Sequence, residues 1–192
     1  MFTHVSVLLS FVFAIAITHL LTSATELVWA RDRVRLSWLQ ALWMFNALLV
    51  LLVNWIGMFY LSARPHWDVA EVTINFVGAI VQYFSCSLIS LRVQEGDGLI
   101  DMPGFFERQR PFIFGAFLAM TGMNLFENWW DRNAELNPNL WITADLTVAP
   151  MLFFIALAGW ARPKWLQWFG GIAYGALSGY FLFAYSLSGT VT

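Results

Sequence analysis

Polar residues recur through one apolar stretch of the sequence, residues 71–92. They follow one another at intervals of three or four residues: Glu71, Asn75, Gly78, Gln82 and then Ser85 or Cys86. These intervals place side chains on one face of an α-helix. A polar face in a membrane is costly unless it looks into the protein or into a wet cavity. The pattern leaves two interpretations open, hydrogen bonding between helices or the wall of a path for a small polar solute or ion.

Polar residues of the other predicted spans fall at two common depths, since each helical residue adds ~1.5 Å along its axis. The inner layer contains His19, Asn46 and Gln82. The outer layer contains carboxylates and amides: Glu71, Glu127, Asp145, Asn54, Asn75, Asn124 and Asn128. We predict that the following residues line a path: Glu71, Asn75, Gln82, Asn124, Glu127, Asp145, His19 and Asn46.

Acidic side chains gathered at one mouth would attract cations or relay protons. Glu71 and Glu127 also have an alternative place at the headgroup level, where water would solvate them. His19 has a side chain suited to carrying protons near neutral pH, and hydrogen bonding to Asn46 or Gln82 is its alternative role.

A metal site is a weaker candidate at the start of the same stretch. His66, Asp68 and Glu71 offer one nitrogen and two carboxylate groups of the kind that bind divalent metals. The sequence has no Ser-His-Asp pattern, no His-Glu-x-x-His motif and no phosphate-binding loop. We predict no cofactor, and an enzyme is the least favoured of the function classes.

Composition places the chain in a membrane. Of its 192 residues, 59% are hydrophobic and only 11% are charged, whereas a soluble domain has roughly 25% charged residues. The sequence lacks a basic tract, so we do not expect a nucleic-acid partner. Its single cysteine, Cys86, excludes a disulfide within one chain.

Hydropathy predicts an all-α, polytopic membrane protein, a six-helix transmembrane bundle in a single domain, residues 1–192. A span needs ~20 apolar residues, and six stretches meet this requirement: about 5–29, 37–61, 69–91, 112–130, 140–160 and 165–188. The first stretch lacks a basic start and a clear cleavage site, so we interpret it as a retained span. We expect residues 102–110 to form a short amphipathic turn on the membrane surface.

The distribution of Lys and Arg predicts the orientation of the bundle. Eight of the ten lie in three loops: Arg31, Arg33, Arg35, Arg92, Arg108, Arg110, Arg162 and Lys164. The other side has only Arg64 and Arg132. We therefore expect those three loops in the cytoplasm and both termini outside (N-out, C-out).

Glycines recur in the last predicted span at intervals of four residues: Gly171, Gly175 and Gly179. Small residues at this spacing let another helix approach closely. The partner helix could belong to the same chain or to a second molecule. We predict self-association, with this face as the first candidate interface.

Two resemblances bear on the family. Residues 12–18, Val-Phe-Ala-Ile-Ala-Ile-Thr, resemble the first helix of small bacterial relatives of the endolysosomal potassium channels. The Arg-x3-Phe-Ser-Asp motif of that family is replaced here by His4, Leu8, Leu9 and Ser10. Residues 17–21, 31–35 and 104–110 resemble small bacterial multi-span inner-membrane proteins without an assigned activity. The second resemblance implies a bacterial inner membrane and no particular chemistry.

Two functions remain in view for a multi-pass protein of the bacterial inner (cell) membrane. The first is a channel or carrier for a small cation or protons, through a polar path along residues 71–92. The alternative is a non-catalytic membrane subunit or scaffold that binds partner helices. The expected partners are the lipid bilayer and either a second copy of the chain or another membrane subunit.

Overall fold

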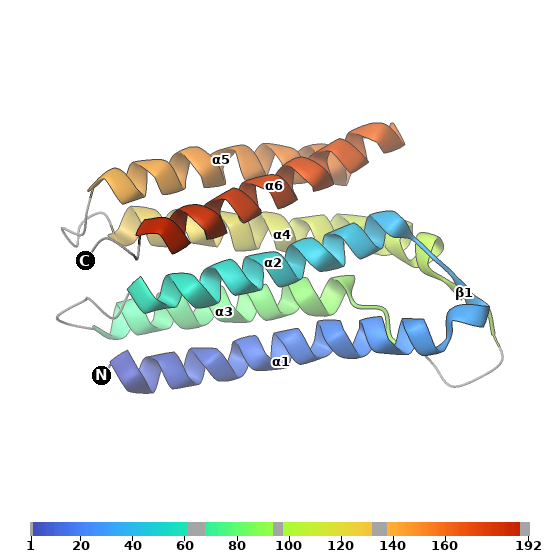
Figure 1. The fold of residues 1–192 in the computed structure, drawn as a ribbon, viewed down its shortest axis with the longest axis horizontal. Helices are drawn as coiled ribbons and strands as arrows, with labels where there is room; N and C mark the ends of the chain where they lie inside the picture. The colour runs from blue at the N-terminus through green and yellow to red at the C-terminus, as the bar shows by residue number, and fades with distance from the viewer. Residues whose placement is uncertain (1, 61–67, 94–97, 132–137, 189–192) are drawn as a thin grey trace.

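A computed structural model describes residues 2–60, 68–93, 98–131 and 138–188. Within these ranges, the side chains of residues 2, 59–60, 131, 138–145 and 184–188 are not described. The described residues form six α-helices (Figure 1): α1 Phe2–Trp29, α2 Trp38–Tyr60, α3 Val69–Ile89, α4 Met102–Asp131, α5 Pro138–Trp160 and α6 Lys164–Ser188. The predicted all-α class is confirmed.

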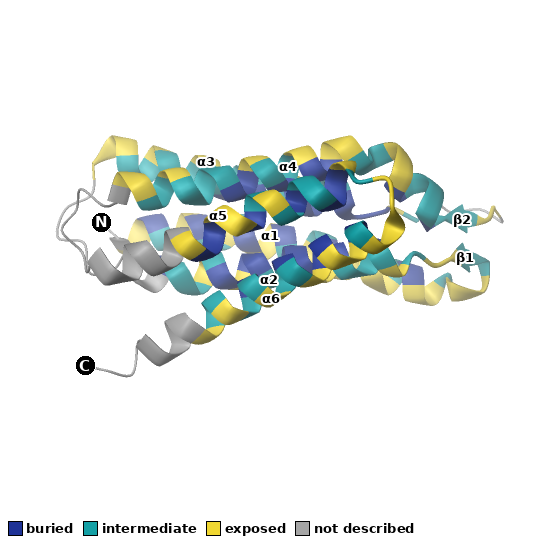
Figure 2. Ribbon diagram, turned by 90° about the horizontal axis from the view of Figure 1, so that it is seen from above, coloured by how far each residue is buried: buried dark blue, intermediate teal, exposed yellow. Residues whose placement is uncertain are grey.

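Three helical segments of the described chain are long and apolar enough to cross a membrane: Thr3–Trp29, Trp38–Met58 and Val69–Ile89. The apolar part of α5, Leu146–Trp160, is shorter. Large apolar side chains such as Phe11, Phe84 and Phe153 point outward from the bundle, and exposed positions alternate with buried ones along the helices (Figure 2). An apolar outer surface of this kind is typical of a protein that sits in lipid.

The six helices lie along a common axis, and consecutive helices run in opposite directions (Figure 1). Around the bundle, α3 packs on α4, α4 on α5, α5 on α6, and α6 on α2. The circuit closes between α2 and α3, and α1 lies against both, chiefly against α3. The start of α1 and the end of α6 lie at the same end of the bundle.

An aromatic cluster fills the bundle near the end where α2 and α4 begin. We use this name for Trp43, Phe106, Phe114, Phe117 and Tyr174, which are all almost fully buried. The ring centroid of Trp43 lies 4.7 Å from that of Phe114 and 5.0 Å from that of Phe117, with the rings edge to face. Edge-to-face rings attract through their quadrupoles as well as by dispersion. Aromatic rings therefore make up a large part of the core in this half of the bundle.

Two glycines of α6, Gly171 and Gly175, pack against another helix of the same chain. A Cβ on Gly175 would stand 2.6 Å from Oδ1 of Asn46, and one on Gly171 would stand 2.8 Å from the Leu42 side chain, so α6 approaches α2 at both positions. Gly179 has open space around it. The interface between molecules that we predicted at Gly171 and Gly175 is thus occupied by α2, because the absence of side chains there lets the two helices meet.

Helix α4 begins ten residues earlier than the predicted start of the fourth span. Residues 102–110 form its first turns instead of a separate turn on the membrane surface. Met102 is buried with Leu27 and Leu91 in a small apolar cluster at this end of the bundle. Pro103 is compatible with a helix start because the first amides have no partner within the helix.

Two short strands lie beside that cluster. Strand β1 (Val34–Arg35) pairs in parallel with β2 (Ile100–Asp101), so the connection after α1 is joined to the start of α4. Nη1 of Arg35 lies 3.8 Å from Oδ1 of Asp101. The sequence contains no repeating pattern that would indicate this pairing of distant segments. It is therefore absent from our sequence predictions.

Candidate functional site

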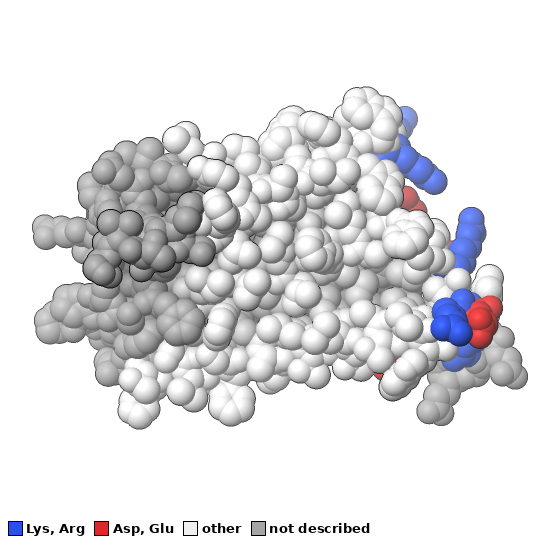
Figure 3. Space-filling view, viewed as in Figure 1, with Lys and Arg blue, Asp and Glu red and all other residues white. Residues whose placement is uncertain are grey.

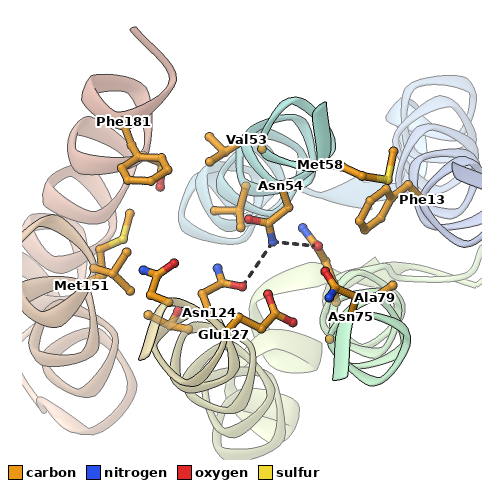
Figure 4. A pocket seen from close by; sticks show the side chains of 18 of the residues that line it. Phe13, Val53, Asn54, Met58, Asn75, Ala79, Asn124, Glu127, Met151 and Phe181 are labelled. Atoms are coloured by element: carbon orange, nitrogen blue, oxygen red, sulfur yellow. Dashed lines mark hydrogen bonds between the residues drawn. The ribbon is translucent and has the colours of Figure 1, made fainter. Parts of the chain in front are cut away.

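A cavity of about 140 Å³ lies inside the bundle, and all six described helices contribute to its lining. Its polar lining comes mainly from α2, α3 and α4, whereas the lining residues of α1 and α5 are all apolar (Figure 4). Helix α2 also adds the apolar side chains of Val50, Val53 and Met58. The polar residues are Asn54, Asn75, Gln82, Thr121, Asn124, Glu127, Asn128, Tyr174 and Ser178. We call this space the central cavity.

Helix α3 supplies Asn75, Gly78 and Gln82 to the central cavity. These are members of the polar line that the sequence shows, and the same line continues in the buried residues Ser85 and Cys86. On the other side of α3, Val77 and Phe84 are exposed. The polar face of this helix therefore points into the bundle, as its spacing predicts.

The start of α3 is fixed by a capping box. Oδ1 of Asp68 accepts a hydrogen bond from the Glu71 amide at 2.7 Å, and Oε2 of Glu71 accepts one from the Asp68 amide at 3.1 Å. Such a cap satisfies two amides that the helix leaves without partners. It also gives Asp68 and Glu71 a structural role, and neither residue lines the central cavity.

A hydrogen-bond network at the centre of the cavity joins three helices. Nδ2 of Asn54 donates to Oε1 of Gln82 at 2.9 Å and is 3.5 Å from Oδ1 of Asn124 (Figure 4). Gln82 is only 1% exposed, and its Nε2 has no acceptor within the described part of the chain. A buried donor without an acceptor costs about 1–3 kcal/mol. An amide nitrogen carries two N–H groups, so Nε2 of Gln82 has capacity to donate to a water or to a bound solute.

Glu127 adds a carboxylate to the lining of the cavity. Its side chain extends from α4 toward α3 and lies against Gly78, so that a Cβ at Gly78 would overlap Oε1 of Glu127. Both residues line the central cavity. An acidic side chain in an apolar bundle is costly unless polar groups or water surround it, and Glu127 is only half-buried. The arrangement presents one carboxylate among several amide groups.

Apolar side chains complete the lining. Phe13 and Met58 lie on the side of α1, and Met151 and Phe181 lie on the side of α5 and α6 (Figure 4). A polar patch surrounded by apolar side chains is the usual composition of a site for a small molecule. Here the polar groups come from adjacent helices, so a shift between those helices would change the site.

The aromatic cluster separates the central cavity from the opposite end of the bundle. Tyr174 belongs to both, because it lines the cavity and its ring centroid lies 5.4 Å from that of Trp43. Trp43 precedes Asn54 by eleven residues on α2, a distance of ~16 Å at the usual helical rise. On this side the cavity therefore reaches the aromatic cluster at Tyr174.

His19 and Asn46 do not line the central cavity. Nε2 of His19 lies 3.5 Å from Nη2 of Arg92, and its ring packs edge to face on Tyr83. Nδ2 of Asn46 donates to the carbonyl of Gly171 at 2.9 Å. Asn46 shares its face of α2 with the lining residues Val50 and Asn54 but lies nearer the start of that helix, where it packs on α6. Neither residue therefore joins Gln82 in the predicted inner layer.

Two of the predicted site residues, Asp145 and His66, have side chains that lie outside the described residues. Asp145 belongs to α5, whereas the whole of His66 lies outside the described residues. Among the residues that the structure describes, no group of three His, Cys, Asp or Glu side chains is arranged to hold a metal ion.

Of the predicted path residues, the structure brings together Asn75, Gln82, Asn124 and Glu127 in one cavity. The prediction omitted Thr121 and Ser178, which line the same space. A signal for Thr121 was present, because it precedes Asn124 by three residues and so shares its helical face. Ser178 follows Tyr174 by four residues and so shares the helical face of that residue.

Comparison with known proteins gives no match for this chain, whether with family models, with curated proteins or with solved structures.

Proposed function

We propose that this chain is a six-span membrane protein that binds a small cation in the central cavity and carries it across the membrane. The observation that carries the proposal is the position of Glu127 beside the network of Asn54, Gln82 and Asn124. A carboxylate attracts a cation, and amide oxygens replace the water that the cation loses on binding.

The size of the cavity supports a small solute. A water in the liquid occupies ~30 Å³, so a cavity of about 140 Å³ holds only a few waters or a small ion with part of its hydration shell. Ammonium, a hydrated alkali ion or a small primary amine fits this description. In each case Glu127 supplies the opposite charge.

A carrier agrees with the aromatic cluster better than an open channel does. Trp43, Phe114 and Phe117 are fully buried against one another on one side of the cavity, so large rings stand in any route in that direction. A solute could pass only if these helices rearranged, as they do in carriers that alternate access between two sides. Because His19 and Asn46 lie outside the cavity, we do not include them in the proposed route.

The proposed orientation is N-out and C-out in a bacterial inner membrane. Its support is the distribution of charge: on the face shown in Figure 3, Lys and Arg gather at the end of the bundle opposite the start of α1, and most of the flank drawn in white carries no charge. Positive residues favour the cytoplasmic side. The central cavity then lies nearer the outer end, because Asn124 and Glu127 belong to the last third of α4.

The alternative function is a non-catalytic subunit that binds partner helices. The glycine spacing in the sequence favours it, but the packing of α6 supports it less. Gly171 and Gly175 are used within the chain, and only Gly179 of that series has open space. Self-association remains a prediction, with the part of α6 around Gly179 as its candidate surface.

A flux assay in proteoliposomes tests the proposal. We expect wild-type protein to move ammonium, sodium, potassium or protons faster than empty liposomes do. Glu127→Gln should reduce that flux at least tenfold, since it removes the charge and keeps the shape of the side chain. Glu107→Gln is the matched control, because Glu107 is an exposed acid at the opposite end of α4 and pairs with Arg110. Equal flux in wild-type and empty liposomes for all four ions would contradict the carrier proposal.

A further inference from the structure

An apolar groove of about 530 Å³ lies between α1 and α2, near the end of the bundle where Lys and Arg gather. It exists because α1 packs chiefly on α3 and leaves its other flank apart from α2. Its volume is within the ~300–1,000 Å³ typical of ligand sites. None of its lining residues belongs to the central cavity.

The walls and the floor of this groove differ in exposure. Leu21 and Val28 on α1 and Phe45 on α2 are exposed although they line it, whereas Leu27 and Met102 at its floor are buried. The wall on α1 runs from Leu20 to Val28, about 12 Å at the usual helical rise. An elongated apolar groove that opens on the flank of the bundle matches an acyl chain.

One charged residue, Arg31, stands among these apolar side chains. Its Nε lies 3.8 Å from Oδ1 of Asp32, and both side chains are largely exposed. Exposed ion pairs contribute about 0–1 kcal/mol, so this pair does not prevent the guanidinium from binding another anion. A guanidinium matches the geometry of a phosphate group, and basic pockets between membrane helices bind anionic headgroups.

A transmembrane helix fits this groove poorly. Helices in membranes associate through small residues that allow close backbone approach. The walls here carry Leu21, Phe45 and other large, flexible side chains, and among the lining residues only Ala24 and Ala41 are small. Large aliphatic side chains with one cation at the end are complementary to a flexible chain with one anion at its head.

We propose that the groove between α1 and α2 binds an anionic phospholipid, with an acyl chain along the groove and its phosphate at Arg31. The lipid would fill the space between the two helices and hold α1 in place. This inference does not depend on solute transport. It requires only that the chain lies in a membrane, with which its apolar helices agree.

Lipid binding can be measured on the delipidated full chain in detergent, by native mass spectrometry and by the rise in melting temperature as lipid is added. We expect dioleoyl phosphatidylglycerol to bind at least fivefold more tightly than dioleoyl phosphatidylcholine. Arg31→Gln should weaken phosphatidylglycerol about fivefold and leave phosphatidylcholine unchanged. Arg162→Gln, an exposed charge outside the lining of the groove, is the control and should have no effect.

Filling the groove provides a second test that does not change charge. Ala24→Trp places a large side chain in the groove, and Ala14→Trp places the same side chain at an exposed position of α1 that does not line it. We expect only Ala24→Trp to reduce the binding of both lipids. Glycerol 3-phosphate alone should not raise the melting temperature. Equal lipid binding by the two Trp variants, or equal stabilisation by glycerol 3-phosphate and the whole lipid, would overturn the proposal.

Discussion

The carboxylate of Glu127 on α4 lies against Gly78 on α3, in the space that a Cβ would occupy at that position. This contact explains why a glycine stands in the polar line of α3 between Asn75 and Gln82. The two neighbours contribute amides to the cavity, whereas Gly78 contributes room. The position of the acidic group therefore depends on a residue that has no side chain.

Gly78→Ala is the direct test of this relationship. The added methyl group would collide with Oε1 of Glu127, and because a carboxylate is the end of a flexible side chain, we expect it to move rather than to prevent folding. Overpacking of this kind costs about 1–3 kcal/mol. Cation flux should fall about tenfold, while the melting temperature should fall only slightly.

A double variant distinguishes displacement of the carboxylate from general damage. Glu127→Asp shortens the side chain by one methylene group, which leaves room for the new methyl group. We expect the flux of Gly78→Ala combined with Glu127→Asp to exceed that expected from the two single variants. Strictly additive losses would show that the contact does not control the site.

The hydrogen bonds of Asn54 lead to a second prediction. Asn54→Leu removes the donor that serves Gln82 and Asn124 and leaves their oxygens without it, at a cost of about 1–3 kcal/mol for each group that becomes unsatisfied. We expect a lower melting temperature. We also expect a loss of cation binding, which calorimetric titration measures.

Asn46→Leu is the comparison for that variant. Asn46 is also buried and also loses a hydrogen bond, to the Gly171 carbonyl, but it does not line the central cavity. It should destabilise the protein and leave the affinity of the folded fraction unchanged. Equal loss of affinity in both variants would mean that binding responds to stability alone.

The sequence was sufficient to predict the helices and the inward face of α3, because intervals of three and four residues report directly on one face of a helix. Counting depth along the helices placed Asn75, Asn124 and Glu127 in one layer and Gln82 in another, whereas the structure brings all four to one cavity. The sequence was not sufficient to pair faces of different helices. His19 matches Gln82 in predicted depth, yet it contacts Arg92, because the rotation of α1 depends on contacts that a linear pattern does not contain.

The same limit explains the glycines and the start of α4. A series of small residues predicts a close approach but not the identity of the approaching helix, which proved to be α2 of the same chain. Charged residues in 102–110 lowered the hydropathy and suggested a surface turn. The burial of Met102 and Phe106 outweighs those charges, which point outward at Glu107 and Arg108.

The packing of α6 gives a third prediction. Gly175→Leu should destabilise the folded chain by at least ~2 kcal/mol, because a side chain there meets Asn46 and forces two packed helices apart. Gly179→Leu is the matched control and should be tolerated, since a Cβ at that position would have no other atom within 4 Å. Thermal unfolding in detergent compares the two.

The same pair of variants tests self-association. If the chain forms oligomers through the part of α6 around Gly179, light scattering coupled to size exclusion should show a smaller particle for Gly179→Leu. A smaller but stable particle for Gly175→Leu alone would instead contradict the assignment of Gly175 to packing within the chain.

The proposed orientation is tested by accessibility of single cysteines on a Cys86→Ser background. Thr3 lies at the start of α1, and Ser37 precedes α2 at the opposite end of the bundle. In intact cells, an impermeant maleimide should label Thr3→Cys from outside and should label Ser37→Cys only after the membrane is opened. The reverse pattern would invert the proposed topology and place the central cavity nearer the cytoplasm.

The aromatic cluster gives the last prediction, which separates a barrier from ordinary core packing. Trp43 is fully buried and contacts Phe114, Phe117 and Tyr174. Trp43→Ala would open a void between the central cavity and the opposite end of the bundle, and large-to-small changes of this size cost about 3–5 kcal/mol. Trp43→Leu fills part of the void and should destabilise the fold less.

If the cluster is the barrier, Trp43→Leu should raise cation leak in proteoliposomes several-fold while Trp38→Leu, at an exposed position, leaves it unchanged. A folded Trp43→Leu protein with the leak of wild type would show that the barrier lies elsewhere and that the ring serves only to pack the core.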